Sequence, residues 1–105
     1  MRPSETVVII GGGLSGLAAG ALLARRGFAV RLFEANDKLG GSCATTTLEG
    51  FTFNDGAVQL ALPGALDDLF ERVGLDRAAI LPLRKITANF STTQPDGTTV
   101  TLGEG

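Results

Sequence analysis

The chain has 105 residues and a mass of 10.8 kDa, so it is one domain at most. Its net charge of −2 and its pI near 4.9 give no electrostatic footprint for nucleic acid or anionic lipid, and its 44% hydrophobic content is that of an ordinary folded protein. The chain has no histidine, which excludes Ser-His, Cys-His and His-zinc mechanisms within it. It has a single cysteine, Cys43, so it cannot form an internal disulfide. We expect no metal site and, lacking a credible signal peptide, a reducing cytoplasmic compartment.

The segment from Val7 to Glu34 predicts a strand, a glycine turn, a helix and a second strand. Val7 to Ile10 is a β-branched run suited to a strand that is buried on both faces. The helix is expected from about Leu14 to Arg26, with Gly27 as its left-handed cap. The second strand is expected from Phe28 to Phe33. Together these elements form one βαβ unit of an α/β fold.

The turn of this unit carries a glycine fingerprint. Gly11, Gly13 and Gly16 stand in the G-x-G-x-x-G spacing, with Gly12 as an extra glycine. In this motif the first glycine permits the tight turn, the second lets a pyrophosphate approach the backbone, and the third lets the helix close on the strand. The helix start adds free N–H groups and about half a positive charge. Glu34 lies 18 residues beyond Gly16, where a carboxylate accepts hydrogen bonds from ribose hydroxyls and repels a 2′-phosphate.

A second interpretation of the same stretch is a helical hairpin or a secretion signal. Val7 to Ala24 is uncharged for 18 residues and follows Arg2. However, five of the 18 are glycine, three of them consecutive. Each interior glycine disfavours a helix by about 1 kcal/mol relative to alanine, so we favour the dinucleotide-binding interpretation.

The middle of the chain predicts a loop and then two short extended segments. Residues 35–42 have poor helix signals, and the pair Gly40–Gly41 offers bare backbone to a second part of a long cofactor or forms a plain turn. Residues 50–62 alternate enough to suggest two extended segments broken at the Asn54-Asp55-Gly56 turn. The phenylalanines are expected in the core rather than at a substrate, and Cys43 is expected to be a packed or incidental thiol.

The last third predicts helices followed by a hairpin. Pro63 can open a helix that ends at Gly74, with an apolar stripe on one face. Asp76 to Ile80 predicts one short helical turn. Alternating residues from Ile86 to Phe90 and from Val100 to Leu102 flank the turn Gln94-Pro95-Asp96-Gly97 and predict a β-hairpin.

Several of these residues carry a family resemblance. Glu34, Gly40–Gly41, Gly50-Phe51-Thr52-Phe53 and Gly56 resemble the N-terminus of the FAD-dependent amine-oxidase superfamily. Within it, the pattern GFTFNDGAVQLALPGALDDLFERVGL is most similar to phytoene desaturases, carotenoid isomerases and retinol saturase-like proteins. The resemblance covers about Val7 to Leu75 and implies the N-terminal part of a Rossmann-like FAD-binding domain, incomplete in this chain.

Two positions depart from the family pattern. Ser42 stands where many members have arginine, although the isomerase and saturase branch resembles it here. Asn54 stands where members usually have aspartate, with Asp55 displaced by one position. The second departure weakens any carboxylate role at this loop.

The resemblance also implies which residues bind FAD. Residues 11–16 would hold the pyrophosphate, and Glu34 would bind the adenosine ribose. The pair Gly40–Gly41 would approach the diphosphate, and residues 56–58 would lie near the isoalloxazine ring. The full set of expected cofactor-binding residues is Gly11, Gly12, Gly13, Leu14, Ser15, Gly16, Glu34, Ala35, Gly40, Gly41, Ser42, Gly56, Ala57 and Val58. No catalytic side chain is expected in this segment, because the flavin would carry the redox step.

These expectations combine into one hypothesis for the chain. Residues 1–60 are expected to form the FAD-binding βαβ segment, and residues 61–105 the start of an inserted substrate domain. The full-length protein would be a flavin-dependent oxidoreductase acting on an apolar polyene-type small molecule, and this fragment alone would be inactive. We expect no nucleic-acid partner, membrane contact only through regions outside these residues, and self-association if the open sheet edge is left uncovered. An NAD-dependent dehydrogenase and a non-enzymatic lipid carrier of the Rab GDP-dissociation-inhibitor type are the alternatives.

Overall fold

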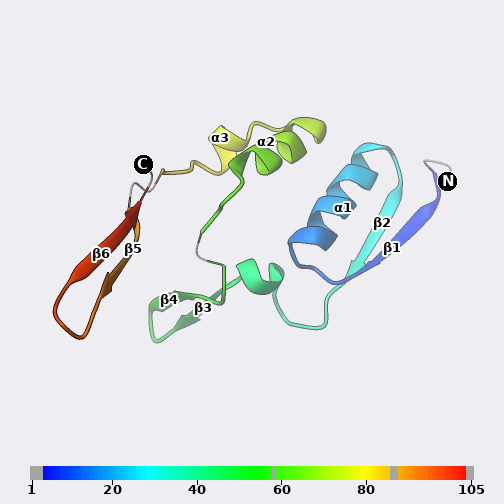
Figure 1. Ribbon diagram of the computed structural model, residues 1–105. Coiled ribbons are helices and arrows are strands. Elements are labelled where there is room, and N and C mark those ends of the chain that lie inside the picture. The colour runs from blue at the N-terminus through cyan, green and yellow to red at the C-terminus, as the bar shows by residue number, and fades with distance from the viewer. Residues whose placement is uncertain (1–3, 58, 86–87, 104–105) are drawn as a thin grey trace.

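A parallel βαβ unit forms the first third of the chain. The computed structural model describes residues 4–57, 59–85 and 88–103. Strand β1 (Thr6–Ile10) pairs in parallel with β2 (Ala29–Phe33), and helix α1 (Leu14–Arg25) crosses between them (Figure 1). Gly27 caps α1 with a φ of +96°, in the left-handed region. The predicted strand, helix and strand are therefore confirmed within one or two residues at each boundary.

Helix α1 covers only one face of this two-stranded sheet. Gly20 of α1 is buried against that face, where an ideal Cβ would lie 3.3 Å from Cδ1 of Ile9. On the opposite face Val8 and Ile10 are 57% and 89% exposed. The prediction that β1 is buried on both faces is therefore wrong for this chain, because no described element packs on the second face.

The chain continues through a single 3-10 turn (Gly41–Cys43) into an antiparallel hairpin of β3 (Thr45–Leu48) and β4 (Phe51–Asn54). The hairpin turns at Glu49 and Gly50, which have φ values of +50° and +83°. Two positive φ values in a two-residue loop match the right-handed twist of a hairpin. Of the two extended segments predicted in residues 50–62, the first is present as β4 and the chain bends after it at residues 55–56, as predicted. The second is wrong for the described residues, because 57 and 59–62 form no strand.

Two helices follow the hairpin. Helix α2 (Pro63–Arg72) has proline in its first turn, and its apolar stripe is half-buried, comprising Leu66, Leu69, Phe70 and Val73. Gly74 ends this segment with a φ of +78° and lies against the guanidinium group of Arg25 from α1. The short helix α3 (Arg77–Ile80) begins with Asp76, whose side chain accepts a hydrogen bond from the N–H of Ala78. Both helices were predicted from the sequence.

The last described strands, β5 (Ala88–Thr93) and β6 (Thr99–Gly103), form a second antiparallel hairpin. The predicted Pro-Asp-Gly turn is present: Gly97 has a φ of +87°, and the Asp96 carboxylate accepts the N–H of Thr98 at 2.8 Å. Ile86, the first residue of the predicted alternation, lies outside the described residues.

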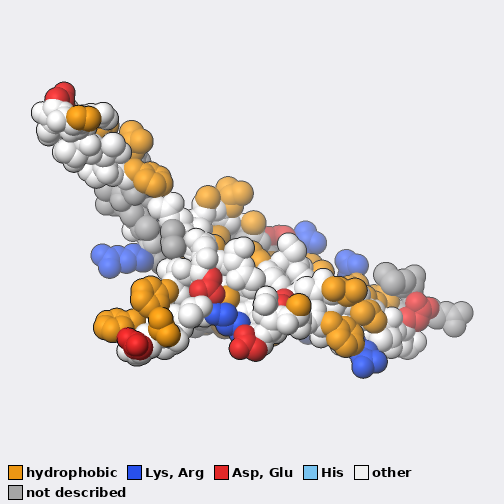
Figure 2. Space-filling model, turned by 90° about the horizontal axis from the view of Figure 1, so that it is seen from below, with side chains coloured by type: hydrophobic (Ala, Val, Ile, Leu, Met, Phe, Trp, Pro, Cys, Tyr) orange, Lys and Arg blue, Asp and Glu red, His pale blue; other side chains and the backbone are white. Residues whose placement is uncertain are grey.

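The described elements do not close around a common core. The Cα radius of gyration is 18.6 Å, whereas a compact chain of this length would have about 13 Å. None of the described hydrophobic side chains is buried, and apolar side chains lie exposed near the β1–β2 end and along the projecting β5–β6 hairpin (Figure 2). Phe51 and Phe90 are 68% and 61% exposed, so the core role predicted for the phenylalanines is wrong in this chain, where no described layer opposes them. Among the described helices, none combines the length and apolarity needed to span a bilayer.

Candidate functional site

The first glycine turn joins β1 to α1 at the carboxyl end of the sheet. Gly11 has a φ of +109°, and its N–H donates to the carbonyl oxygen of Phe33 at 2.8 Å, which ties the turn to the end of β2. An ideal Cβ on Gly16 would lie 2.0 Å from the Gly11 carbonyl oxygen, so the helix start packs directly on the turn. Gly12 is buried, and its Cβ would meet Leu39 Cδ2 at 2.4 Å. Glycine is therefore required at Gly11 for its conformation and at Gly16 for space against backbone, whereas at Gly12 the obstacle is the flexible end of a leucine side chain.

Glu34 reaches this turn from the end of β2. Its Oε1 accepts the Gly12 N–H at 2.9 Å, and its Oε2 accepts the Asn36 N–H at 2.8 Å. These backbone hydrogen bonds, first that from Asn36 and then that from Gly12, hold the pKa of the Glu34 carboxyl below its ordinary value. A carboxylate offers about four lone-pair sites, so Glu34 can accept a further donor such as a ribose hydroxyl.

A second glycine turn lies against the first. The Gly40 N–H donates to the Gly12 carbonyl oxygen at 2.8 Å. Gly40 and Gly41 have φ values of +117° and +56°, and an ideal Cβ on Gly41 would lie 3.2 Å from Cα of Gly13. A side chain on Gly41 would push against the first turn, whereas one on Gly40 would meet Ala44, so it is the bare backbone of Gly41 that lets the two turns come together.

The two turns enclose an open hollow of about 430 Å³. Of the residues predicted to bind a cofactor, it brings together Gly11, Gly13, Leu14, Ser15, Gly16, Gly40, Gly41 and Ser42, and it is also lined by Ile10 and Cys43. Gly13 is the N-cap of α1, and among the described residues no side chain caps this helix and no acidic residue stands in its first turn. The first N–H groups of a helix lack carbonyl partners within the helix, so they are available to an anion in this hollow.

The remaining predicted residues that the structure describes do not line the hollow: Gly12 and Glu34 bind each other at the first turn, and Gly56 and Ala57 contact Ser42. The Ala57 N–H donates to the Ser42 carbonyl oxygen at 2.8 Å, and Gly56 lies on the same residue, where its Cβ would be 3.1 Å from that oxygen. Ala35 follows Glu34 but does not line the hollow. Val58 lies outside the described residues.

Two features next to the hollow were not predicted. Lys38 bridges the loop after Glu34 to the β3–β4 hairpin, contacting Thr46 and Asp55, and no periodicity in the sequence indicates this pairing. Cys43 lines the hollow as an exposed thiol, so the packed alternative predicted for it is wrong, and the incidental alternative stays a prediction. Family members usually have aspartate at the position of Asn54, and this was the only sequence feature that indicated a role for the neighbouring Asp55.

The geometry fits the adenosine and diphosphate portion of a dinucleotide. A diphosphate needs N–H donors and close approach, which backbone without Cβ atoms provides, and a ribose needs an acceptor such as the Glu34 carboxylate. The fold and the site therefore define a dinucleotide-binding βαβ unit. Sequence comparison agrees: residues 9–73 match the family described as NAD(P)-binding Rossmann-like domain, and the chain belongs to that family.

The chain is also similar to several characterised proteins. It is 37% identical over 101 residues to 4,4'-diapolycopene oxygenase of Methylomonas sp and 32% identical over 102 residues to 4,4'-diaponeurosporene oxygenase of Staphylococcus aureus (strain USA300), matches that span 96% and 97% of this chain. The chain spans about a fifth, 20%, of the length of each of these relatives. The crystal structure of a CLA-producing fatty acid isomerase from P. acnes superposes with a TM-score of 0.58 and 28% identity, covering 69% of this chain and 18% of that one.

Proposed function

We propose that this chain is the FAD-binding segment of a flavin-dependent oxidoreductase resembling phytoene desaturases. The observation that carries the proposal is the Glu34 carboxylate, bound to the N–H of Gly12 at 2.9 Å beside a hollow lined largely by glycine backbone. An acid at this place supports recognition of an adenosine ribose without a 2′-phosphate. The second glycine turn extends the bare backbone past the first, which suits a cofactor longer than a single nucleotide.

Each predicted residue has a role in this proposal. The turn that holds the pyrophosphate comprises Gly11, Gly12, Gly13, Leu14, Ser15 and Gly16. The N–H groups of Gly11 and Gly12 already donate to Phe33 and Glu34, so the donors to the pyrophosphate are the N–H groups at the start of α1. Glu34 and Ala35 receive the ribose, and Gly40, Gly41 and Ser42 approach the diphosphate from the second turn. The resemblance assigns Gly56, Ala57 and Val58 to the ring side, and of these the structure describes Gly56 and Ala57. When bound, FAD would supply hydride or electron transfer, so the chain's own contribution is binding and orientation, and we nominate no catalytic side chain in it.

The names of the relatives support the substrate class. Diapolycopene and diaponeurosporene are long apolar polyenes, and the similar structure is named a fatty acid isomerase. We therefore propose an apolar polyene-type substrate for the full-length enzyme. The division into a cofactor segment at residues 1–60 and a substrate-domain start at residues 61–105 stays a prediction.

A visible spectrum of the purified full-length protein tests the cofactor. We expect flavin absorbance and, after denaturation, a released yellow flavin whose mass is that of FAD. A colourless protein that binds NADH would favour the dehydrogenase alternative, and a colourless protein that binds neither but retains lipid would favour the carrier.

A variant pair tests the site itself. Glu34→Ala should lower the retained FAD after gel filtration, because charge-assisted hydrogen bonds to the ribose are lost. Glu71→Gln, on α2 and away from the hollow, is the control and should retain the wild-type amount. Equal FAD content in Glu34→Ala and wild type would contradict the ribose role of Glu34.

A further inference from the structure

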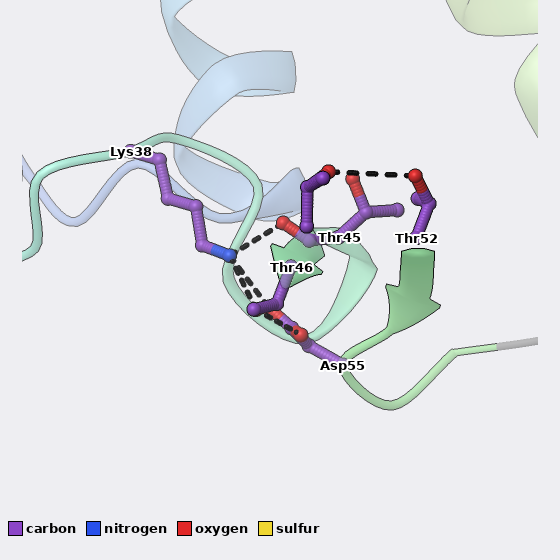
Figure 3. A network of polar contacts seen from close by, with 6 residues as sticks. Lys38, Thr45, Thr46, Thr52 and Asp55 are labelled. Atoms are coloured by element: carbon purple, nitrogen blue, oxygen red, sulfur yellow. Dashed lines mark hydrogen bonds and ion pairs between the residues drawn. The ribbon is translucent and has the colours of Figure 1, made fainter. Parts of the chain in front are cut away.

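Lys38 uses all three of its ammonium donors within the chain. It donates to the carbonyl oxygen of Thr45, to Oγ1 of Thr46 at 2.8 Å and to Oδ2 of Asp55 at 2.9 Å (Figure 3). A lysine ammonium has three N–H bonds, so no donor is left over for a ligand. Lys38 therefore acts through the chain segments that it joins rather than by touching a bound molecule.

The same network is closed from its other side. The Thr46 hydroxyl donates to Oδ1 of Asp55 at 2.7 Å, so both carboxylate oxygens are occupied. The Thr46 and Lys38 hydrogen bonds lower the pKa of the Asp55 carboxyl, which stays ionised at neutral pH. We call Lys38, Thr46 and Asp55 the lysine latch.

The lysine latch spans the segment that carries the second glycine turn. Lys38 lies two residues before Gly40, and its acceptors Thr45 and Thr46 begin β3 just after the 3-10 turn. Backbone bonds fix the same segment to the end of β4, since the Asp55 N–H donates to the Ala44 carbonyl oxygen at 3.0 Å. Lys38 before the Gly40–Gly41 turn and Ala44 after it are thus both hydrogen-bonded to the β3–β4 hairpin or to Asp55 at its end.

This fastening matters because glycine backbone is costly to order. Gly40 and Gly41 adopt positive φ values, and glycine loses more conformational freedom on ordering than any other residue. Their contact with Gly13, and the hydrogen bond from Gly40 to Gly12, hold only while the turn keeps its place. A side-chain bridge across the turn reduces the freedom that a ligand would otherwise have to remove.

We infer that Lys38, through the lysine latch, is a positioning residue that holds the Gly40–Gly41 turn against Gly13 and so sets the affinity for the diphosphate of the cofactor. This inference rests on the proposed function, since it assumes that the hollow between the turns receives a diphosphate. It also predicts selectivity: removal of the lysine latch should weaken the binding of FAD, which would contact both glycine turns, more than that of AMP, which would contact only the first.

The test uses the full-length protein with Lys38→Met, its conservative partner Lys38→Arg, and Arg72→Met as a matched control. Arg72→Met removes an exposed ion pair of similar length, 2.8 Å to Asp68, on α2 away from the glycine turns. We expect Lys38→Met to raise the FAD dissociation constant about five-fold and the AMP constant by less than about two-fold. Lys38→Arg should restore most of the FAD affinity, and Arg72→Met should leave both constants unchanged.

Hydrogen exchange of residues 38–46 without ligand is the second readout. Exchange at the Gly40 N–H should become faster in Lys38→Met and stay at the wild-type rate in Arg72→Met. Unchanged exchange, or equal losses for FAD and AMP, would overturn the positioning role while leaving the proposed function intact. A wild-type protein that binds neither FAD nor AMP would overturn the proposed function, and with it the ligand half of this inference.

Discussion

Replacing Gly16 with alanine tests the contact that brings α1 onto the first glycine turn. An ideal Cβ there would lie 2.0 Å from the Gly11 carbonyl oxygen, although real Cβ atoms do not approach within 3.0 Å. Because the Gly11 carbonyl oxygen belongs to the backbone, no side chain can rotate away to make room. Either the turn or the helix must move by about 1 Å. Overpacking of this kind costs about 3 kcal/mol, and the better helix propensity of alanine returns about 1 kcal/mol. We therefore expect a net loss of about 2 kcal/mol in the free energy of unfolding.

Urea unfolding of the full-length protein measures this loss, with Gly64→Ala as the matched control. Gly64 also stands in the first turn of a helix, α2, and an ideal Cβ there meets nothing within 4 Å. Gly64→Ala should be neutral or stabilising by up to about 1 kcal/mol. If Gly16→Ala unfolded at the same urea concentration as Gly64→Ala, the close packing of α1 on the turn would be refuted.

Three further predictions concern the site. Gly13→Ala should leave the free energy of unfolding within about 0.5 kcal/mol of the wild-type value, because its Cβ would lie 3.9 Å from Gly41 Cα. It should nevertheless weaken ADP binding about ten-fold, because it places a methyl group between the two turns, and calorimetric titration of both proteins with ADP measures this difference. Glu34→Gln should reduce the preference for ADP over 2′-phospho-ADP, because the charge that repels the 2′-phosphate is gone, and an unchanged ratio of dissociation constants would contradict this. Hydrogen bonds lower the pKa values of Glu34 and Asp55 in the folded protein. The two carboxylates therefore contribute their full stabilisation at a pH above the ordinary carboxyl pKa, and this stabilisation is lost as the pH falls through the lowered pKa values. FAD retention should therefore be constant from pH 7 to about 5 and decline below the ordinary carboxyl range, and Asp55→Asn should remove part of that decline.

The βαβ unit could be predicted because its signals are local. A β-branched run, glycines at fixed spacing, and an arginine and a glycine at the helix end each act on neighbouring residues, and the parallel register of β1 and β2 follows from the crossover. The position of Glu34 beside Gly12 also follows, because carboxyl ends of adjacent parallel strands share one edge.

The β3–β4 hairpin was missed for a different reason. Its two-residue turn uses Glu49 at positive φ, a conformation that side chains other than glycine, asparagine and aspartate rarely adopt. The Asn54-Asp55-Gly56 sequence offered a stronger turn signal a few residues later. Asp55 instead pairs with Lys38, a contact that depends on how the hairpin meets the loop and so cannot be found from local sequence.

Burial could not be predicted from hydrophobicity either. Phe51, Phe53 and Phe90 are hydrophobic and alternate as core residues do, but burial also needs an opposing layer, which the described residues do not provide. Hydrophobic pattern indicates which face of an element seeks a partner, and the partner itself is a property of tertiary structure.

The lack of buried apolar side chains among the described residues has a calorimetric consequence. The heat-capacity change of unfolding comes mainly from apolar surface newly exposed to water, and a compact domain of about 100 residues gives about 1.4 kcal/mol/K. Among the described residues, many large hydrophobic side chains already face solvent, including Ile10, Leu62 and Leu102. Heated alone, the chain should therefore absorb little excess heat and melt over a broad range, without the sharp peak of a cooperative domain.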